Sequence, residues 1–109
     1  MSLYNQIYLK VAEIPSGTVA SYGQVAKAAG LFRGAQVVGW ALRQLPADTE
    51  IPWQRVVAKD GRITIVNPKL SKTEQIERLQ EEGIEIEQRE GWYRVKGESF
   101  WFSFPEESV

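Results

Sequence analysis

Apolar residues recur every three or four positions over three separate stretches, which is the spacing of helices that bury one face. The first stretch covers residues 2–14 and is stopped by residues 15–17, Pro-Ser-Gly. The second stretch begins at Ser21, where Ser21 and Gln24 have the spacing of a capping box, and it ends at Gly30, a residue suited to a left-handed cap. The pattern therefore predicts two helices before residue 31.

The third stretch predicts a helix that Pro46 closes. Its apolar face consists of Val37, Val38, Ala41, Leu42 and Leu45. Together with the preceding short helix it predicts a helix-turn-helix over about residues 21–45. This helix is also rich in small residues, namely Gly34, Ala35, Gly39 and Ala41. Small residues allow either close packing between helices or close approach to another surface, and the pattern alone leaves both open.

Beyond residue 50 the pattern changes to short β-like runs. A turn at residues 59–62, Lys-Asp-Gly-Arg, separates residues 56–57 from residues 63–65 and predicts a hairpin between them. Ser71 to Glu74 has the spacing of a second capping box and opens a polar helix. Alternation over residues 84–95 predicts a second hairpin that resembles a wing.

We therefore expect one domain over residues 1–109, mainly α with a small β component, of the helix-turn-helix or winged-helix-like DNA-binding class. Its expected parts are the helix-turn-helix, a loop at about 51–57, and a C-terminal helix with a wing-like hairpin at about 71–96. The aromatic tail at residues 100–104 is expected to dock on the helices, with a partner surface as the alternative.

Composition narrows the chemistry further. The 109 residues are 43% hydrophobic and 25% charged, as in an ordinary globular domain, and no apolar window is long enough for a membrane span. The first ten residues lack the pattern of a secretory signal, so we expect a cytoplasmic monomer, nucleoid-associated if bacterial. The chain contains no Cys and no His, which excludes thiolate nucleophiles, zinc-thiolate sites and histidine bases. We expect no metal and no cofactor.

Charge is distributed unevenly along the chain. Residues 1–70 carry eight Lys and Arg against four Asp and Glu, whereas residues 71–109 carry five against ten. The net charges of the two parts are therefore +4 and −5, although the whole chain has −1. The asymmetry indicates either a basic face for a polyanion or a chance imbalance, and it predicts that the acidic part faces away from DNA.

Three motifs, taken together, resemble the DNA-binding domain of O6-alkylguanine-DNA alkyltransferases over roughly residues 5–83. The motifs are Ile14-Pro15-x-Gly17-x-Val19-x-Ser21-Tyr22-Gly23, then Val38-Gly39-x-Ala41-Leu42, then Ile51-Pro52-Trp53-Gln54-Arg55-Val56-Val57 followed by Asp60-Gly61. Members of that family carry Pro-Cys-His-Arg-Val at the third motif, and their chemistry is an irreversible alkyl transfer to the Cys thiolate. Trp53 stands at the Cys position and Gln54 at the His position. An indole cannot supply a sulfur nucleophile and a carboxamide cannot act as the base, so the chain resembles the non-repairing alkyltransferase-like proteins.

The resemblance implies that the loop at 51–57 forms the floor of a pocket for a flipped-out alkylguanine. Trp53 would pack on the base, with Tyr22, Pro52 and Val56 as the other pocket residues. Contact between a base and an aromatic ring contributes about 1–3 kcal/mol. The alternative is that Trp53 is a core residue whose N–H finds a carbonyl oxygen.

The same resemblance implies a DNA-binding surface on the helix-turn-helix. Tyr22 is expected to contact a phosphate beside the target, and Gln36 stands where members commonly carry an Arg that fills the gap left by the flipped base. Arg33 could compensate for the lost cation. Arg55 could contact phosphate or hold the loop through carbonyls or a carboxylate. The predicted DNA-binding residues are Ser21, Tyr22, Arg33, Gln36, Gly39, Arg43, Arg55, Lys59 and Arg62.

These expectations lead to one functional hypothesis and two alternatives. The resemblance implies a protein that binds double-stranded DNA with O6-alkylguanine lesions, flips the base and marks it for nucleotide-excision repair proteins without alkyl transfer. One alternative is a winged-helix transcription regulator of undamaged DNA, although Arg43 is the single Lys or Arg in residues 34–45. The other is an enzyme that uses carboxylates, for which Asp60 is the nearest acidic residue.

Overall fold

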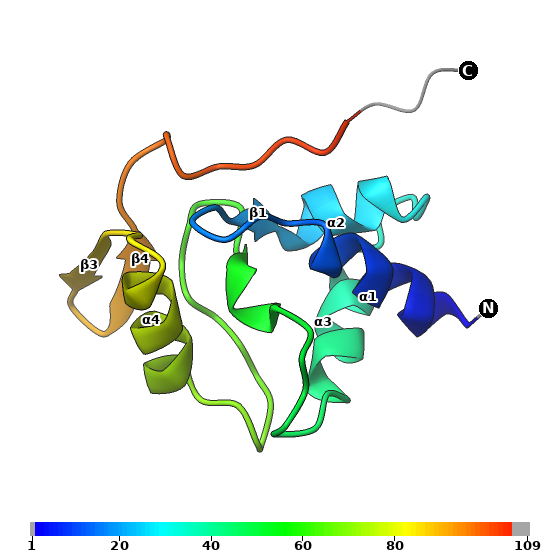
Figure 1. Cartoon of the computed structure of the whole chain (residues 1–109), viewed down its shortest axis with the longest axis horizontal. Helices are drawn as coiled ribbons and strands as arrows, with labels where there is room; N and C mark the ends of the chain where they lie inside the picture. The colour runs from blue at the N-terminus through cyan, green and yellow to red at the C-terminus, as the bar shows by residue number, and fades with distance from the viewer. Residues whose placement is uncertain (1, 106–109) are drawn as a thin grey trace.

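The helix-turn-helix and the C-terminal hairpin lie at opposite ends of the molecule, with the loop after residue 50 between them (Figure 1). The computed structural model describes residues 2–105. Within these residues no helix is long and apolar enough to cross a membrane. The elements are α1 (Leu3–Ala12), β1 (Ala20–Ser21), α2 (Tyr22–Ala28), α3 (Ala35–Arg43), the short 3-10 helix η1 (Trp53–Arg55), β2 (Val56–Val57), α4 (Lys72–Glu81), β3 (Ile86–Arg89) and β4 (Trp92–Val95).

Side-chain caps set the starts of α1 and α2. The Ser2 hydroxyl accepts a hydrogen bond from the Asn5 N–H at 3.2 Å. At α2 the predicted capping box is confirmed: Ser21 Oγ accepts from the Gln24 N–H at 3.0 Å, and the Ser21 N–H donates to Gln24 Oε1 at 2.9 Å. Gly30 follows α2 with a φ of +81°, as expected of a left-handed cap. The three predicted helices and the helix-turn-helix are thereby confirmed.

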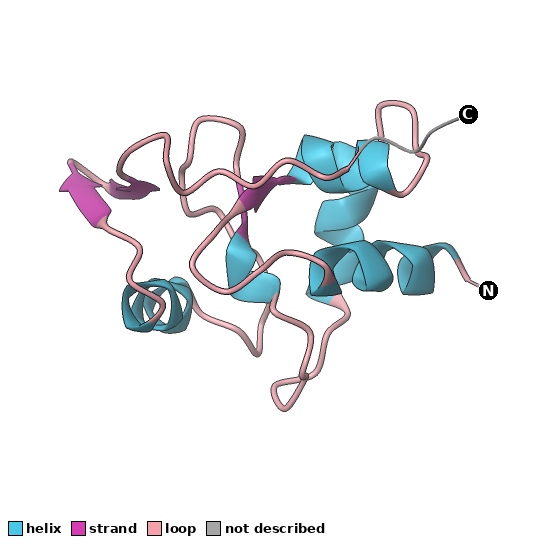
Figure 2. Cartoon of the chain, turned by 45° about the horizontal axis from the view of Figure 1, so that its top comes forward, coloured by secondary structure: helices cyan, strands magenta, loops and turns pink. Residues whose placement is uncertain are grey.

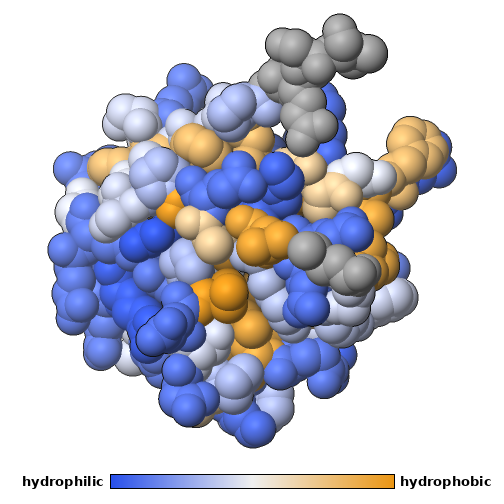
Figure 3. All heavy atoms as spheres, turned by 45° about the vertical axis from the view of Figure 1, so that its right-hand side comes forward, coloured by the Kyte–Doolittle hydropathy of each residue, from blue (hydrophilic) through white to orange (hydrophobic). Residues whose placement is uncertain are grey.

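The main hydrophobic core lies between α1, α2, α3 and η1. The Tyr8 hydroxyl crosses from α1 to α3 and donates to the Ala41 carbonyl oxygen at 2.6 Å. Some large apolar side chains remain exposed, and Figure 3 shows apolar patches among hydrophilic residues on one face. The fully buried members of this core are Ile7, Val11, Ala20, Val25, Val38, Ala41, Leu42, Trp53 and Val56.

A parallel pair of short strands replaces the hairpin predicted around residues 59–62. Strand β2 pairs with β1, with Ala20 opposite Val56 and Ser21 opposite Val57. The turn itself is present, but the Ile63 N–H that follows it donates to the Tyr93 carbonyl oxygen at 2.9 Å. A hydrogen bond from the Ala58 N–H to the Arg62 carbonyl oxygen at 3.0 Å closes the turn. The predicted pairing of residues 56–57 with 63–65 was wrong, because β2 pairs with β1 and the segment after the turn pairs with β4.

The C-terminal part forms α4 and an antiparallel hairpin, as predicted (Figure 2). Ser71 caps α4 by accepting from the Glu74 N–H at 3.0 Å. The Glu74 carboxylate pairs with Arg78 one turn later at 2.8 Å, so it does not return to Ser71 as a full capping box requires. Strands β3 and β4 are in register with Ile86 opposite Val95.

The aromatic tail docks beside β1, which confirms docking as the better expectation. Val19 exchanges two backbone hydrogen bonds with the tail, one to Phe100 and one from Phe102, both at 2.8 Å. Gln24, the capping residue of α2, also donates its side-chain amide to the Phe102 carbonyl oxygen at 2.8 Å. One glutamine therefore joins the start of α2 to the tail.

One carboxylate, Glu82 at the end of α4, connects three distant segments. It accepts from the Gly17 N–H at 2.8 Å, from Gln54 Nε2 at 2.8 Å and from Arg55 Nε at 3.0 Å. Arg55 in turn donates to the Ile14 carbonyl oxygen at 2.8 Å. Burial tends to raise the pKa of Glu82, but the hydrogen bonds from Gly17, Gln54 and Arg55 outweigh it and lower the pKa below 4.5.

We expect Glu82→Gln to lower the free energy of unfolding by about 2–3 kcal/mol at pH 7, because Arg55 loses its partner while it remains largely buried. Since the folded-state pKa of Glu82 is lowered, its stabilising effect is present above the unfolded-state pKa and disappears as pH falls through the folded-state value. The difference between wild type and variant should therefore shrink below about pH 4.5. Urea denaturation at several pH values measures it. Glu77→Gln, an exposed carboxylate on the same helix, should change little, and an equal effect of both variants would contradict the role of Glu82.

Candidate nucleic-acid interface

A hollow of about 260 Å³ lies between α3, the start of α2 and the segment after residue 63. We call it the α3 hollow. Its volume is close to the lower end of small-molecule pockets, and Arg43 is the charged residue among those that line it. Its lining residues are Tyr22, Gln36, Gly39, Trp40, Arg43, Thr64, Ile65 and Val66.

Four of these residues come from one face of α3. Gln36, Gly39, Trp40 and Arg43 follow one another at intervals of three, one and three, so they form a single stripe along the helix. The opposite side of α3 buries Val38, Ala41 and Leu42 in the core, and the stripe therefore remains available to a ligand along nearly the whole helix.

Tyr22 forms the wall of the hollow next to the start of α2. The capping box and the β1–β2 pair hold the backbone on its N-terminal side. Burial raises the pKa of the Tyr22 phenol, an effect that the neighbouring Thr64 hydroxyl partly offsets. The phenol therefore stays protonated at neutral pH and can donate a hydrogen bond, for instance to a phosphate oxygen.

Two glycines, Gly34 before α3 and Gly39 within it, differ in whether the fold has room for a side chain. A Cβ atom on Gly34 would lie 2.5 Å from the Leu31 Cβ, so the turn before α3 requires a glycine there. A Cβ atom on Gly39 would meet nothing within 4 Å. The fold therefore gives no steric reason for a glycine at position 39. Ala41, by contrast, is fully buried and serves the packing of α3.

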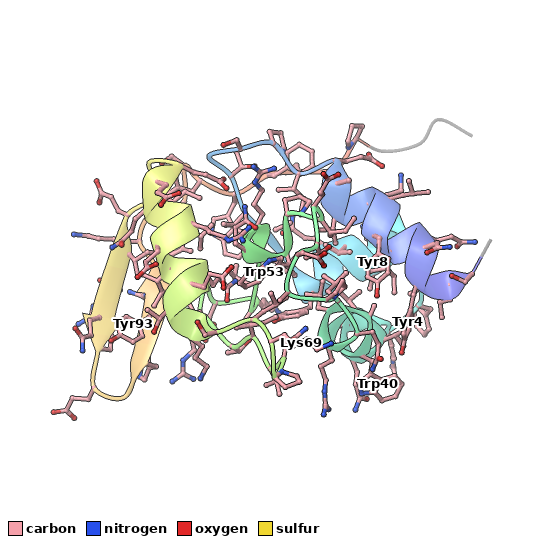
Figure 4. All side chains as sticks on the ribbon, turned by 60° about the horizontal axis from the view of Figure 1, so that its bottom comes forward. Tyr4, Tyr8, Trp40, Trp53, Lys69 and Tyr93 are labelled. Carbon is pink, nitrogen blue, oxygen red and sulfur yellow. The ribbon has the colours of Figure 1, made fainter. Side chains whose placement is uncertain are left out.

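Trp53 does not form an open pocket floor in this structure, which corrects the expectation drawn from the third motif. Its side chain has 0% exposure, and it lies inside the molecule at the start of η1 (Figure 4). The Arg78 guanidinium lies 5.4 Å from its ring centroid. The Glu82 network holds the adjacent Gln54 and Arg55 at the end of α4, and the indole on the same short helix packs in the core. No described residue accepts a hydrogen bond from the Trp53 Nε1–H, so the alternative of a carbonyl partner is not met either.

Other residues predicted to line the pocket or to contact DNA also make contacts that hold the fold together. Val56 is fully buried in β2, and Pro52 precedes η1 without lining the α3 hollow. The Ser21 hydroxyl is occupied as the α2 cap. Arg55 was also predicted to bind DNA, and this is corrected: its guanidinium is bound to Glu82 and to a carbonyl oxygen, as the alternative role had it.

The remaining predicted cations are exposed or lie outside the hollow. Arg33 is exposed in the turn before α3, with a φ of +55° and its guanidinium 5.4 Å from the Phe32 ring centroid. Lys59 is exposed in the turn after β2. Arg62 lies with its guanidinium 4.3 Å from the Trp92 ring centroid. The structure therefore brings together Tyr22, Gln36, Gly39 and Arg43 but not these three.

The sequence analysis missed four of the lining residues, Trp40, Thr64, Ile65 and Val66, and Trp40 is the largest of them. It is 46% exposed on the stripe of α3, and it points away from the body of the molecule in Figure 4. A signal was present in the sequence, because Trp40 lies four residues after Gln36 and therefore on the same helical face. Its neighbours Gly39 and Ala41 belong to the small residues of this helix, and this pattern does not indicate an aromatic contact.

The fold and the hollow define a helix-turn-helix domain with one exposed face on its second helix, the architecture of DNA-binding domains. Comparison with protein families identifies the family: the model of the 6-O-methylguanine DNA methyltransferase DNA-binding domain matches residues 2–84. The chain belongs to this family.

Individual relatives agree with this assignment. The chain is 39% identical over 85 residues to alkyltransferase-like protein 1 of Schizosaccharomyces pombe, a match that covers 78% of this chain and 79% of that protein. It is 40% identical over 85 residues to the DNA base-flipping protein of Escherichia coli, covering 78% of this chain and 64% of that protein. The crystal structure of S. pombe Atl1 in complex with damaged DNA containing O6-carboxymethylguanine is similar with a TM-score of 0.80 and 36% identity, covering 93% of this chain and 94% of that one.

We expect Trp53→Ala to lower the free energy of unfolding by about 3–5 kcal/mol, because it leaves a large cavity in the core. Trp53→Phe keeps most of the apolar volume and removes the unpartnered N–H donor, so its loss should be much smaller. Chemical denaturation followed by circular dichroism measures both. A Trp53→Ala variant as stable as wild type would show that the indole is not a core residue.

The two glycines should respond oppositely to alanine. Gly39→Ala should raise the free energy of unfolding by about 0.5–1 kcal/mol, since alanine favours the helix and its Cβ meets open space. Gly34→Ala should lower it by about 1–3 kcal/mol, because its Cβ overlaps Leu31. Denaturation midpoints compare the pair, and a destabilised Gly39→Ala would mean that the fold itself requires this glycine.

Proposed function

We propose that this protein binds double-stranded DNA containing an O6-alkylguanine, draws the damaged base out of the stack and holds it without transferring the alkyl group. The observation that carries the proposal is the stripe on α3 beside the α3 hollow. The stripe offers a helix face to a groove, and the hollow next to it offers a place for one base. A relative with 36% identity and the same fold is in complex with DNA that carries an O6-alkylguanine.

The residues of the stripe suit this task. Gly39 lets the backbone of α3 approach DNA, Arg43 adds a positive charge for phosphate, and the Gln36 amide can bond an exposed base edge. The Tyr22 phenol, in the wall of the hollow, can donate a hydrogen bond to a phosphate oxygen. Figure 1 supports the orientation, since residues 72–95, which form α4 and the hairpin and carry four Lys and Arg against seven Glu, lie at the end opposite to α3. The negative charge of residues 72–95 would therefore be kept away from the phosphates.

The absence of alkyl transfer follows from the residues themselves. The chain has no Cys and no His, so no thiolate is available to accept the alkyl group. Gln54 stands at the position of the family's base, and its amide donates a hydrogen bond to the Glu82 carboxylate. A carboxamide does not titrate and cannot act as a base. A bound lesion is therefore retained unchanged, and we propose that the complex marks it for nucleotide-excision repair proteins.

Trp53 has an indirect role in this proposal. It shares a core cluster with Ile65, and Tyr22 packs against the same cluster. Both residues line the α3 hollow, so the indole supports the hollow from within instead of touching a base. The bulky ring occupies the position where the family places its reactive sulfur.

The test compares binding of one duplex that contains a single O6-methylguanine with the same duplex that contains guanine. Fluorescence anisotropy at two stated salt concentrations gives both affinities and their salt dependence. We expect tighter binding to the methylated duplex, by tenfold or more if one extra base contact of about 1.4 kcal/mol is gained. Nucleoside analysis after prolonged incubation should recover all of the O6-methylguanine. Equal affinities would remove the proposal, and loss of the methyl group would disprove binding without chemistry.

Gly39→Ala provides the matched control for the docking face. Its methyl group should hold α3 away from DNA and weaken binding to both duplexes severalfold, although the protein itself becomes more stable. An exposed substitution on α1, Leu9→Ala, should leave both affinities unchanged. If Gly39→Ala bound DNA as well as wild type, α3 would not be the element that approaches the groove.

A further inference from the structure

A large aromatic side chain stands half-exposed on the face of α3 that the proposed function turns toward DNA. Trp40 has 46% exposure, whereas Trp53 has none. A single exposed apolar residue needs no explanation in itself. Trp40 differs because it also lines the α3 hollow, so its ring is presented to whatever enters that space.

The walls of the hollow suit a flat ring with polar edges. Aromatic and apolar groups, Trp40, Tyr22, Ile65 and Val66, alternate with a few groups that form hydrogen bonds. Val66 is 64% exposed, so the segment on the other side of the hollow also offers apolar surface. Mostly apolar walls with a small number of polar groups are the usual composition of a site that fixes an aromatic ligand.

We propose that Trp40 supplies the stacking face for the extruded base. This inference rests on the proposed function, since it names the side chain by which the hollow holds the base. The indole offers a large rigid surface, and stacking on it tolerates every base because each has a π-face. Gln36, one turn earlier on α3, is positioned to bond the edge of the same base or of its former partner.

Trp40 takes the role that the family resemblance implies for Trp53. The Trp53 indole has no exposed surface in this structure, whereas the Trp40 indole is 46% exposed. Recognition by stacking therefore lies on the helix, and the loop at 51–57 provides support.

Three duplexes test the inference, and they carry O6-methylguanine, guanine or an abasic site at one position. We expect Trp40→Ala to weaken binding to the O6-methylguanine duplex by about 5- to 150-fold, the range of base–aromatic stacking. Binding to the abasic duplex should change by less than about twofold, because there is no base to stack. Trp40→Phe should restore most of the lost affinity, and Leu9→Ala, an exposed apolar residue on α1, should behave as wild type.

The comparison of the three duplexes also distinguishes a failure of the Trp40 inference from a failure of the proposed function. If Trp40→Ala weakens all three duplexes equally, Trp40 contacts the groove or fills the gap in the stack, and the inference is overturned. No change with any duplex overturns it as well, while the wild-type preference for O6-methylguanine leaves the proposed function intact. If wild type itself shows no preference, the proposed function fails first. Circular dichroism melting of each variant verifies that a loss of binding is not a loss of folding.

Discussion

The Glu82 carboxylate is the constraint on which the arrangement of this protein depends. It joins the turn after α1, the η1 segment and the end of α4, three parts that are far apart in the sequence. A carboxylate so placed requires a cation and several donors, and Arg55, Gln54 and the Gly17 N–H supply them. Because these partners are fixed at the same point, the loop at 51–57 has one orientation, with its aromatic residue inward.

With this orientation of the loop at 51–57, the residues that support the fold and the residues proposed to contact DNA lie on different elements. The loop that carries the family's reactive residue provides, in this chain, a buried indole and a short strand next to β1. The strand pair places Ser21, and therefore Tyr22, beside the segment that follows residue 63. What meets DNA is then the stripe on α3 and the hollow beside it, both of which stand on the buried scaffold.

The sequence predicts those parts of the fold that local chemistry decides. Ser21 with Gln24, and Gly30 after them, mark α2 because a cap depends on neighbouring residues. The parallel β1–β2 pair and the contact of Arg55 with Glu82 join residues about 27 to 36 positions apart, and no local pattern encodes them. The burial of Trp53 depends on that distant contact, so the motif could identify the position but not the direction of its side chain. Trp40 was overlooked because its significance comes from Tyr22 and Val66, which are close to it only in the folded chain.

The docked tail has a thermodynamic consequence. Its backbone bonds to Val19 and its bond to the Gln24 amide lie immediately beside the start of α2, where Tyr22 stands. A protein that captured residues 100–104 would have to break these bonds, and it would thereby loosen the residue that caps α2. Any coupling between the hollow and the tail through the start of α2 is reciprocal, because linkage gives each site the same effect on the binding free energy of the other.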